Sequence, residues 1–136
     1  MEKRKVKAVI ERASDGTYSI YHDADGLGYL VTGTGSTVEE AMKCFEEGYK
    51  DIKRLCAKTG MPFTEVDMVY TYDIASFLAY YSKVLSLAGL SRLTGINQQQ
   101  LSQYATGRRN PSPKTVAKVD AAIHAFAQDL SAVTFV

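Results

Sequence analysis

The sequence is poor in the residues that build metal centres and disulfide frameworks. Its 136 residues include two cysteines, Cys44 and Cys56, two histidines and no CxxC pair. Both cysteines fall on one predicted helix, where a rise of 1.5 Å per residue separates them by ~18 Å, too far for a disulfide bond. We therefore expect no disulfide, no metal site and no cofactor.

Long hydrophobic runs are also missing. No apolar stretch approaches the ~18 residues that a membrane-spanning helix requires. The basic N-terminal stretch Met1–Gly16 contains too short an apolar run for a signal peptide. Together with the scarcity of cysteine, this predicts a cytoplasmic protein without a membrane partner. A hydrophobic content of 46% and a charged content of 23% are ordinary for a folded chain, so disorder is not expected.

No charge of one sign dominates, since the formal net charge is +1. The distribution is uneven, however, because residues up to Tyr72 carry 10 Lys and Arg against 12 Asp and Glu, whereas residues from Asp73 carry 6 against 3. The second half is therefore mildly basic, which is the sign that a nucleic-acid partner would need.

The first half of the chain alternates between strand and helix patterns. Three segments alternate apolar and polar residues and are predicted to be strands joined by short turns, an antiparallel meander: Lys5–Arg12, Thr17–His22 and Tyr29–Thr34. An amphipathic helix follows from Val38 and ends at Gly60, and Glu65–Tyr72 predicts a fourth strand. The order is β-β-β-α-β.

Two details of that helix are open to more than one interpretation. Its first turn offers two capping boxes, either Ser36 with Glu39 or Thr37 with Glu40. Gly48 lies inside the helix, where glycine is unfavourable by ~1 kcal/mol relative to alanine, so it is a candidate for close packing against the sheet.

The second half is predicted to be entirely helical. Asp73 can cap a first helix, and the helices are expected at about 74–85, 87–94, 98–106 and 113–130. The last helix is expected to turn five residues inward: Val116, Val119, Ile123, Phe126 and Leu130. The predicted fold class is α+β, with a β-β-β-α-β unit at residues 1–72 and an all-α unit of four to five helices at residues 73–136.

The segment Ser86–Pro113 has the order of parts of a helix-turn-helix. Gly95 suits the sharp turn, and Asn97 can cap the second helix of the pair. The first turn of that helix enters the major groove in such motifs, and glutamine can both donate to and accept from adenine. The predicted DNA-binding residues are Ser86, Asn97, Gln98, Gln99, Gln100, Ser102, Gln103, Arg108 and Arg109.

Within this set the expected roles differ. Ser86 is the predicted cap of the first helix, whose N–H groups could meet a phosphate, and Arg108 and Arg109 would contact the sugar-phosphate backbone. The alternative interpretation is a plain helical unit with a polar, solvated surface helix.

The stretch LSRLTGINQQQLSQYATGRRNPSPKTVAKV resembles the lambda-repressor-like, Xre-type DNA-binding domain. The matching features are the glycine turn, the glutamines that open the second helix, the Gly-basic-basic-Asn-Pro loop and the apolar last helix. Ala88-Gly89 departs from the polar helix formers common in that family. The resemblance implies double-stranded DNA as partner, and a homodimer or higher homo-oligomer is expected because such proteins read paired half-sites.

The front unit is similar to the HicB antitoxin family, whose fold is a truncated ribonuclease-H-like unit. The best matches are Gly35, Thr37, Glu40 and Ala41. A proline-containing stretch usual in that family is replaced here by Asp23–Gly28. The resemblance implies an antitoxin that represses its own operon and neutralises a HicA-type ribonuclease toxin. The alternative is a solitary Xre-type regulator whose front unit senses a ligand or only mediates oligomerisation.

Catalysis is not expected from this chain. Asp15, Asp23 and Asp25 lie in turns, where aspartate is favoured for local hydrogen bonding, so they do not predict a two-metal nuclease. His22 beside Asp23 is interpreted as a surface histidine, since no nucleophile pattern accompanies it. Cys44 and Cys56 are interpreted as residues that fill the core or a groove.

Overall fold

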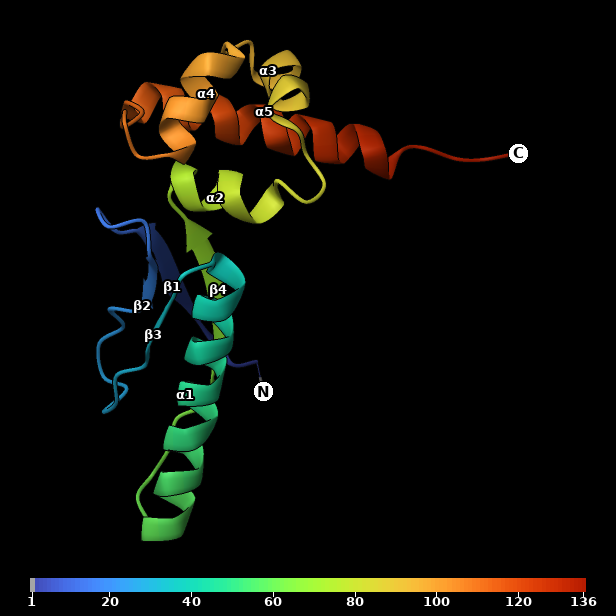
Figure 1. The fold of residues 1–136 in the computed structure, drawn as a ribbon. Coiled ribbons are helices and arrows are strands. Elements are labelled where there is room, and N and C mark those ends of the chain that lie inside the picture. Colours follow the sequence, from blue (N-terminus) through green and yellow to red (C-terminus); the bar gives the residue numbers. More distant parts are fainter. Residues whose placement is uncertain (1) are drawn as a thin grey trace. The chain divides into compact units, whose positions relative to one another are not determined.

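A computed structural model describes residues 2–136, and the chain divides into two compact units, one up to Tyr80 and one from Tyr81 (Figure 1). The fold class is α+β, as predicted. The elements of the first unit are β1 (Arg4–Arg12), β2 (Tyr18–Tyr21), β3 (Thr32–Gly35), α1 (Val38–Thr59), β4 (Val66–Tyr72) and α2 (Ile74–Tyr81). The predicted β-β-β-α-β order is therefore confirmed.

The four strands form one sheet in the order β3-β2-β1-β4. β1, β2 and β3 are antiparallel neighbours, which confirms the predicted meander. β4 lies parallel to β1, with Val9 opposite both Tyr21 on β2 and Thr71 on β4. A parallel neighbour requires a crossover connection, and α1 provides it. This leaves β4 as one edge of the sheet.

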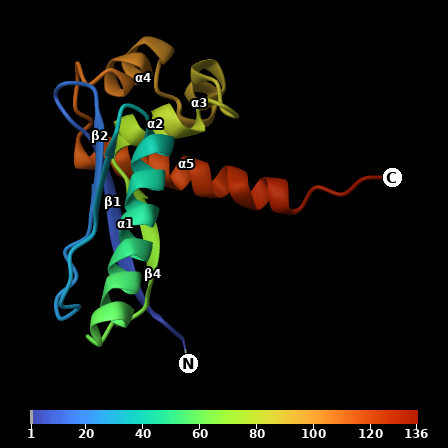
Figure 2. The same ribbon diagram turned by 60° about the horizontal axis from the view of Figure 1, so that its bottom comes forward.

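The core of the first unit lies between one face of the sheet and α1 (Figure 2). Alternate residues of β1 point to this face, so Ala8 and Ile10 are buried while Lys7 and Glu11 are exposed. The buried cluster consists of Ala8, Ile10, Ile20, Val31, Val38, Ala41, Met42 and Phe45.

Glycines on β3 let α1 approach the sheet closely. A Cβ at Gly33 would lie 2.6 Å from the Ala41 carbonyl oxygen and 2.7 Å from the Phe45 Cβ, and one at Gly35 would lie 2.6 Å from the Ala41 nitrogen. A Cβ at Gly48 would instead meet Val31 at an ordinary contact distance of 3.5 Å. The expectation that Gly48 marks the close approach was wrong, because the two β3 glycines provide it.

The N-terminus of α1 uses Thr37 and Glu40, the second of the two possible pairs, but the glutamate bonds Ser36 in place of the Thr37 N–H. Thr37 is the N-cap, and its hydroxyl accepts a hydrogen bond from the Glu40 N–H at 3.1 Å. The Glu40 carboxylate in turn accepts from the Ser36 hydroxyl at 2.6 Å and from the Ser36 N–H at 2.9 Å. These Ser36 donors lower the pKa of Glu40, because they stabilise its charged form.

Helix α2 belongs to the sheet unit because Asp73 ties its start to β1. The Asp73 carboxylate accepts from the Ser76 N–H at 2.7 Å, which confirms the predicted cap, and from the Arg12 N–H at 3.0 Å. Tyr80 packs against the core of the sheet unit. The division therefore falls after Tyr80, eight residues beyond the boundary expected at Tyr72.

Two side chains of the sheet unit lie in environments opposite to those expected. His22 is only 4% exposed, not at the surface, and its Nε2 accepts the Val31 N–H at 3.0 Å. Burial lowers the pKa of His22, and within residues 2–136 its buried Nδ1 has no hydrogen-bond partner. Cys44 is exposed rather than part of the core, because it lies on the solvent side of α1.

The second unit contains α3 (Leu87–Thr94), α4 (Gln98–Ala105) and α5 (Pro113–Ser131). Helix α3 packs on both α4 and α5. The buried apolar residues of this unit are Leu90, Ile96, Leu101, Tyr104 and Val119.

The predicted inner face of α5 is confirmed only in part, since Ile123 and Phe126 are half-buried. Only Val119 of the five residues is buried, whereas Val116 is 40% exposed and Leu130 is 55% exposed. The C-terminal half of α5 extends past α3 and α4, which are too short to cover it (Figure 1).

Candidate nucleic-acid interface

The first helix of the predicted motif begins and ends where its local chemistry requires. Ser86 is the N-cap of α3, and its Oγ accepts from the Gly89 N–H at 3.0 Å. Gly95 ends the helix with φ of 75°, a left-handed conformation that glycine adopts without strain. Its N–H donates to the Ser91 carbonyl at 2.8 Å. The predicted cap and the predicted turn are both present.

A buried threonine that is not among the predicted residues stabilises the turn. The Thr94 hydroxyl donates to the Leu90 carbonyl at 2.7 Å and accepts from the Ile96 N–H at 3.2 Å. One side chain thus satisfies a helix-end carbonyl and a turn N–H, both of which are buried. The sequence Thr94-Gly95-Ile96, a threonine directly before the helix-ending glycine and an apolar residue after it, could have indicated this role.

Helix α4 starts at the predicted cap and rests on the predicted apolar residues. Asn97 is the N-cap, and its side-chain oxygen accepts from the Gln100 N–H at 2.7 Å. Leu101 and Tyr104 are buried one turn apart and hold the helix against the unit. The opposite face of α4 is therefore directed to solvent, where a ligand can reach it.

The three glutamines of the first turn are not equivalent. Gln98 and Gln99 are exposed, and their side chains form no hydrogen bond with any residue from 2 to 136. Gln100 is half-buried, and its Nε2 donates to the Tyr104 hydroxyl at 2.6 Å. Farther along the helix, Ser102 is exposed and Gln103 is half-buried.

A basic loop follows α4. Gly107, with φ of 76°, turns the chain, and the Arg109 N–H donates back to the Gln103 carbonyl at 3.3 Å. Arg108 and Arg109 are exposed, and neither forms an ion pair with any residue from 2 to 136. Two guanidinium groups therefore stand unneutralised beside the end of α4.

Helix α5 adds a cation that is not among the predicted DNA-binding residues. Ser112 caps this helix, accepting from the Thr115 N–H at 3.2 Å, and Pro113 occupies its first position. Lys118 extends from α5 towards the turn, so that its Nζ lies 3.7 Å from where a Cβ of Gly95 would be. Helical periodicity alone could not place this lysine, because the contact joins residues distant in sequence.

These parts define a helix-turn-helix domain: two capped helices joined by a left-handed glycine, with exposed amides and arginines. Residues 84–124 match the protein family described as Helix-turn-helix, across α3, α4 and the first part of α5. The match supports a DNA-binding regulator whose helical domain binds double-stranded DNA and is not itself an enzyme. Comparisons with curated proteins and with solved structures gave no match.

Neither a metal centre nor a membrane span is found in the part of the chain that the structure describes. No three or more His, Cys, Asp and Glu side chains of residues 2–136 gather where they could hold a metal ion. None of the helices in this range combines the length and the apolar character needed to cross a membrane.

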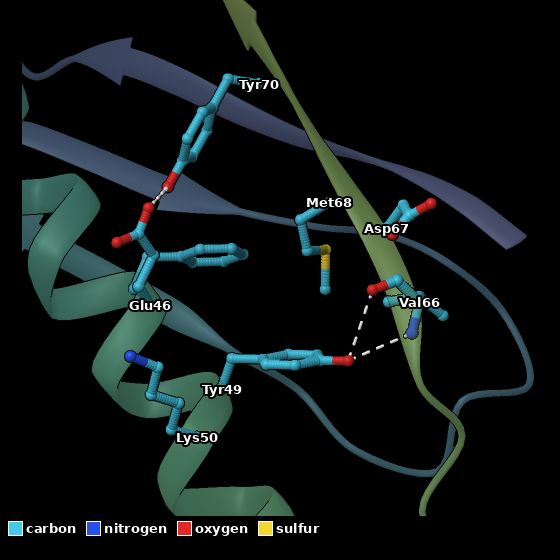
Figure 3. A pocket seen from close by; sticks show the side chains of 8 residues that line it. Glu46, Tyr49, Lys50, Val66, Asp67, Met68 and Tyr70 are labelled. Atoms are coloured by element: carbon cyan, nitrogen blue, oxygen red, sulfur yellow. Dashed lines mark hydrogen bonds between the residues drawn. The ribbon is translucent and has the colours of Figure 1, made fainter. Parts of the chain in front are cut away.

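The sheet unit has a groove of about 430 Å³ between α1 and the edge strand β4 (Figure 3). It is lined by Phe45, Glu46, Tyr49 and Lys50 of α1 and by Val66, Asp67, Met68 and Tyr70 of β4. A single helix is ~10 Å across and cannot cover a sheet of four strands spaced ~4.8 Å apart. Because the β3 glycines hold α1 at the other edge, the uncovered part lies beside β4.

Hydrogen bonds fix which backbone groups of β4 face outward. The Tyr49 hydroxyl accepts from the Val66 N–H at 3.1 Å and donates to the Val66 carbonyl at 3.4 Å, whereas the Asp73 N–H donates to Ile10 on β1. Strand residues alternate in direction, so odd-numbered residues of β4 face β1 and even-numbered ones face the open edge. The N–H and C=O groups of Met68 and Tyr70 thus point outward beside the groove.

The polar wall of the groove is set by one phenol. The Tyr70 hydroxyl donates to the Glu46 carboxylate at 2.9 Å. Burial, together with this hydrogen bond, raises the pKa of Tyr70, so the phenol stays protonated at neutral pH. The groove therefore combines an apolar floor with a carboxylate and the exposed Lys50 at its rim.

Proposed function

We propose that the chain is a sequence-specific transcription regulator that reads base edges with Gln98 and Gln99. The observation that carries the proposal is the exposure of both side-chain amides in the first turn of α4, directly after the turn at Gly95. In helix-turn-helix proteins this turn of the second helix meets the bases in the major groove. A glutamine amide can donate to and accept from adenine at the same time.

The remaining candidates receive positioning roles. Arg108, Arg109 and Lys118 supply positive charge for phosphates, which raises affinity without sequence preference. The N–H groups of the first turn of α3, after Ser86, are directed to a phosphate. Gln100 is held by Tyr104, so it orients the start of α4 instead of reading a base. Asn97 caps that helix.

We assign weaker contacts with DNA to Ser102 and Gln103 than to Gln98 and Gln99. Both lie one turn beyond the leading glutamines, and Ser102 is the more exposed of the two. A hydroxyl can accept from or donate to either kind of base pair, so Ser102 contributes less discrimination than a bidentate amide.

Selection of duplexes from a random library by the full-length protein tests this function. An enriched motif whose recovery is lost in a Gln98→Ala, Gln99→Ala double variant supports it. Enrichment of the same motif by that variant, or no motif with either protein, contradicts base reading by these residues.

For the sheet unit we propose a HicB-like antitoxin role, in which it binds a HicA-type ribonuclease and the helical unit represses the operon in the cytoplasm. The β-β-β-α-β order and the matching residues Gly35, Thr37, Glu40 and Ala41 support it. Those residues also cap or pack the start of α1, so they support a HicB-like fold more strongly than they support a toxin partner. The open β4 edge and its groove favour a protein partner, because an extended segment can add to such an edge.

Co-expression of the full chain with the product of a neighbouring small gene tests the antitoxin role. Rescue of growth and co-purification are expected if that product is a ribonuclease toxin. A protein that binds its operator but neither rescues growth nor binds that product would instead be a solitary regulator. In that case its sheet unit would serve ligand binding or oligomerisation.

A further inference from the structure

The open side of β4 presents a short run of unpaired backbone groups. β4 is the last strand of the sheet and, within residues 2–136, pairs with β1 alone. No residue in this range forms a hydrogen bond with the outward N–H and C=O groups of Met68 and Tyr70. Such groups are completed by another extended chain, because its own N–H and C=O groups have the matching spacing. The edge therefore specifies a polypeptide backbone as its ligand.

The Tyr49 hydroxyl fixes where an added strand can pair. It occupies both outward groups of Val66, at 3.1 Å from the nitrogen and 3.4 Å from the carbonyl oxygen. An added strand must therefore pair with Met68 and Tyr70 and leave the sheet at Val66. Antiparallel pairing is the more stable arrangement per residue. In that direction the residue opposite Tyr70 comes two positions before the residue opposite Met68.

The groove gives these two positions different surroundings. Residues directly opposite each other in an antiparallel pair project to the same face of the sheet, so both side chains of the added strand would enter the groove. Figure 3 shows the Tyr70 hydroxyl with Glu46 at one end of the groove, and Met68 with Tyr49 at the other. The position opposite Met68 is therefore apolar, with Phe45 below it, and the position opposite Tyr70 lies beside a carboxylate.

The charges around the groove select the side chain at the polar end. Glu46 is exposed and forms no ion pair with any residue from 2 to 136. The Tyr70 hydroxyl donates to one of its carboxylate oxygens at 2.9 Å, so the other oxygen is able to accept from a cation. Lys50 lies one turn farther along α1, towards the apolar end, where it disfavours a second cation.

We propose that the β4 edge binds an extended segment of another protein in which a lysine or arginine precedes an apolar residue by two positions. The segment runs antiparallel to β4 and pairs with Met68 and Tyr70. Its basic side chain meets Glu46, and its apolar side chain covers Met68 and Phe45. This inference rests on the proposed role of the sheet unit in binding a protein partner, but it does not require that partner to be a ribonuclease.

Titration of the isotope-labelled, full-length protein with a synthetic peptide tests the proposal. The probe is an end-capped peptide of threonines that contains one lysine and, two residues later, one valine. Amide hydrogens of Met68 and Tyr70 are expected to exchange more slowly with solvent when it binds, whereas that of Val66, already held by Tyr49, should change little. The same peptide N-methylated at its lysine and valine should bind about tenfold more weakly, because it cannot donate to β4.

Glu46→Gln tests the basic position without removing the acceptor for the Tyr70 hydroxyl. It should weaken binding of the lysine peptide about 2- to 5-fold, as loss of an exposed ion pair does, and leave a peptide with glutamine in place of the lysine unaffected. Glu47→Gln is the matched control, because Glu47 is exposed on the same helix but does not line the groove. It should change neither affinity.

Tyr49→Phe is a second variant with the opposite expected sign. It frees the outward groups of Val66, so a peptide lengthened by two residues at its C-terminal end should bind more tightly to the variant than to the wild type. Weaker binding of that peptide would contradict the register.

Absence of saturable binding up to about 1 mM peptide overturns the proposal, and so does binding that N-methylation leaves unchanged. Equal effects of Glu46→Gln on the lysine and glutamine peptides would overturn the basic position. Rescue of growth from a neighbouring toxin is a separate measurement. Peptide binding without rescue contradicts only the antitoxin role, and rescue without peptide binding contradicts only the present inference.

Discussion

The amide of Gln100 donates to the hydroxyl of Tyr104 one turn along α4, at 2.6 Å. This single bond separates Gln100 from the two glutamines before it in sequence. Tyr104 is buried and fixed, so the Gln100 amide is held along the helix and cannot turn to a base without losing that bond. Of the three consecutive glutamines, Gln98 and Gln99 therefore have amides available to a ligand, whereas the Gln100 amide is bonded within the helix.

The first prediction follows from this difference. Gln99→Ala should lower affinity for the selected operator by ~1–3 kcal/mol and change affinity for random duplex little, because one bidentate base contact is lost. Gln100→Ala should act mainly on thermal stability. Titration of labelled duplexes, with melting curves, measures both. Equal losses on operator and random DNA would show that Gln99 does not read bases.

The second prediction concerns the basic loop. Arg108→Ala should weaken binding to every duplex and reduce the slope of log affinity against log salt by ~1, because one phosphate contact is removed. Affinities measured over a series of salt concentrations give the slope. Lys83→Ala, which removes an exposed lysine before α3, is the control. An unchanged slope for Arg108→Ala would rule out a phosphate contact there.

The third prediction compares Gly33 on β3 with Gly48 on α1, two glycines at the contact between the sheet and the helix. Gly33→Ala should lower the free energy of unfolding by ~1–3 kcal/mol or more, because its Cβ would collide with the backbone of α1. Gly48→Ala should be neutral or raise it by ~0.5–1 kcal/mol, because its Cβ meets only ordinary contacts and alanine favours the helix. Urea unfolding of the full chain measures both, and equal effects would contradict the close approach at β3.

The fourth prediction is a pH dependence of stability that comes from His22. Its pKa is lowered by burial from the ordinary 6.5, so between the folded pKa and 6.5 the unfolded chain binds more protons. The stabilisation is therefore complete above about 6.5 and is lost as the pH falls through the folded pKa. Protonation would also place an Nε2 proton against the Val31 N–H. The charge of Asp23 opposes the shift only in part.

Unfolding free energies measured from pH 7.5 down to about 5 test this, since that range contains the ordinary histidine pKa of 6.5, below which the unfolded chain takes up the proton. His22→Gln keeps an oxygen that can accept the Val31 N–H and should flatten the dependence in that window. A variant that follows the wild-type curve would show that other groups cause it.

Local signals in the sequence were sufficient for the caps and turns. Asn97 and Ser86 cap the helices that they were expected to cap, and Gly95 turns the chain as predicted. Each of these depends on a few neighbouring residues, so a short window contains the necessary information. The choice between the two boxes at α1 needed the structure, because Ser36 and Thr37 are equally able to cap.

Features that depend on distant residues could not be read from the sequence. The burial of His22 follows from its contact with Val31, nine residues away across a loop. The parallel pairing of β4 with β1 depends on where the crossover through α1 returns. For α5, periodicity correctly grouped Ile123 with Leu130 on one face, but it could not show that the short helices α3 and α4 end before they cover it.

The hydroxyl of Tyr49 closes the first backbone position on the open edge of β4. Unprotected sheet edges template pairing between molecules, and proteins avoid this by blocking part of the edge. Removing that hydroxyl would leave the Val66 N–H and C=O available to a neighbouring molecule's strand. We therefore expect the Tyr49 hydroxyl, although it lines the groove, also to oppose edge-to-edge association of concentrated protein.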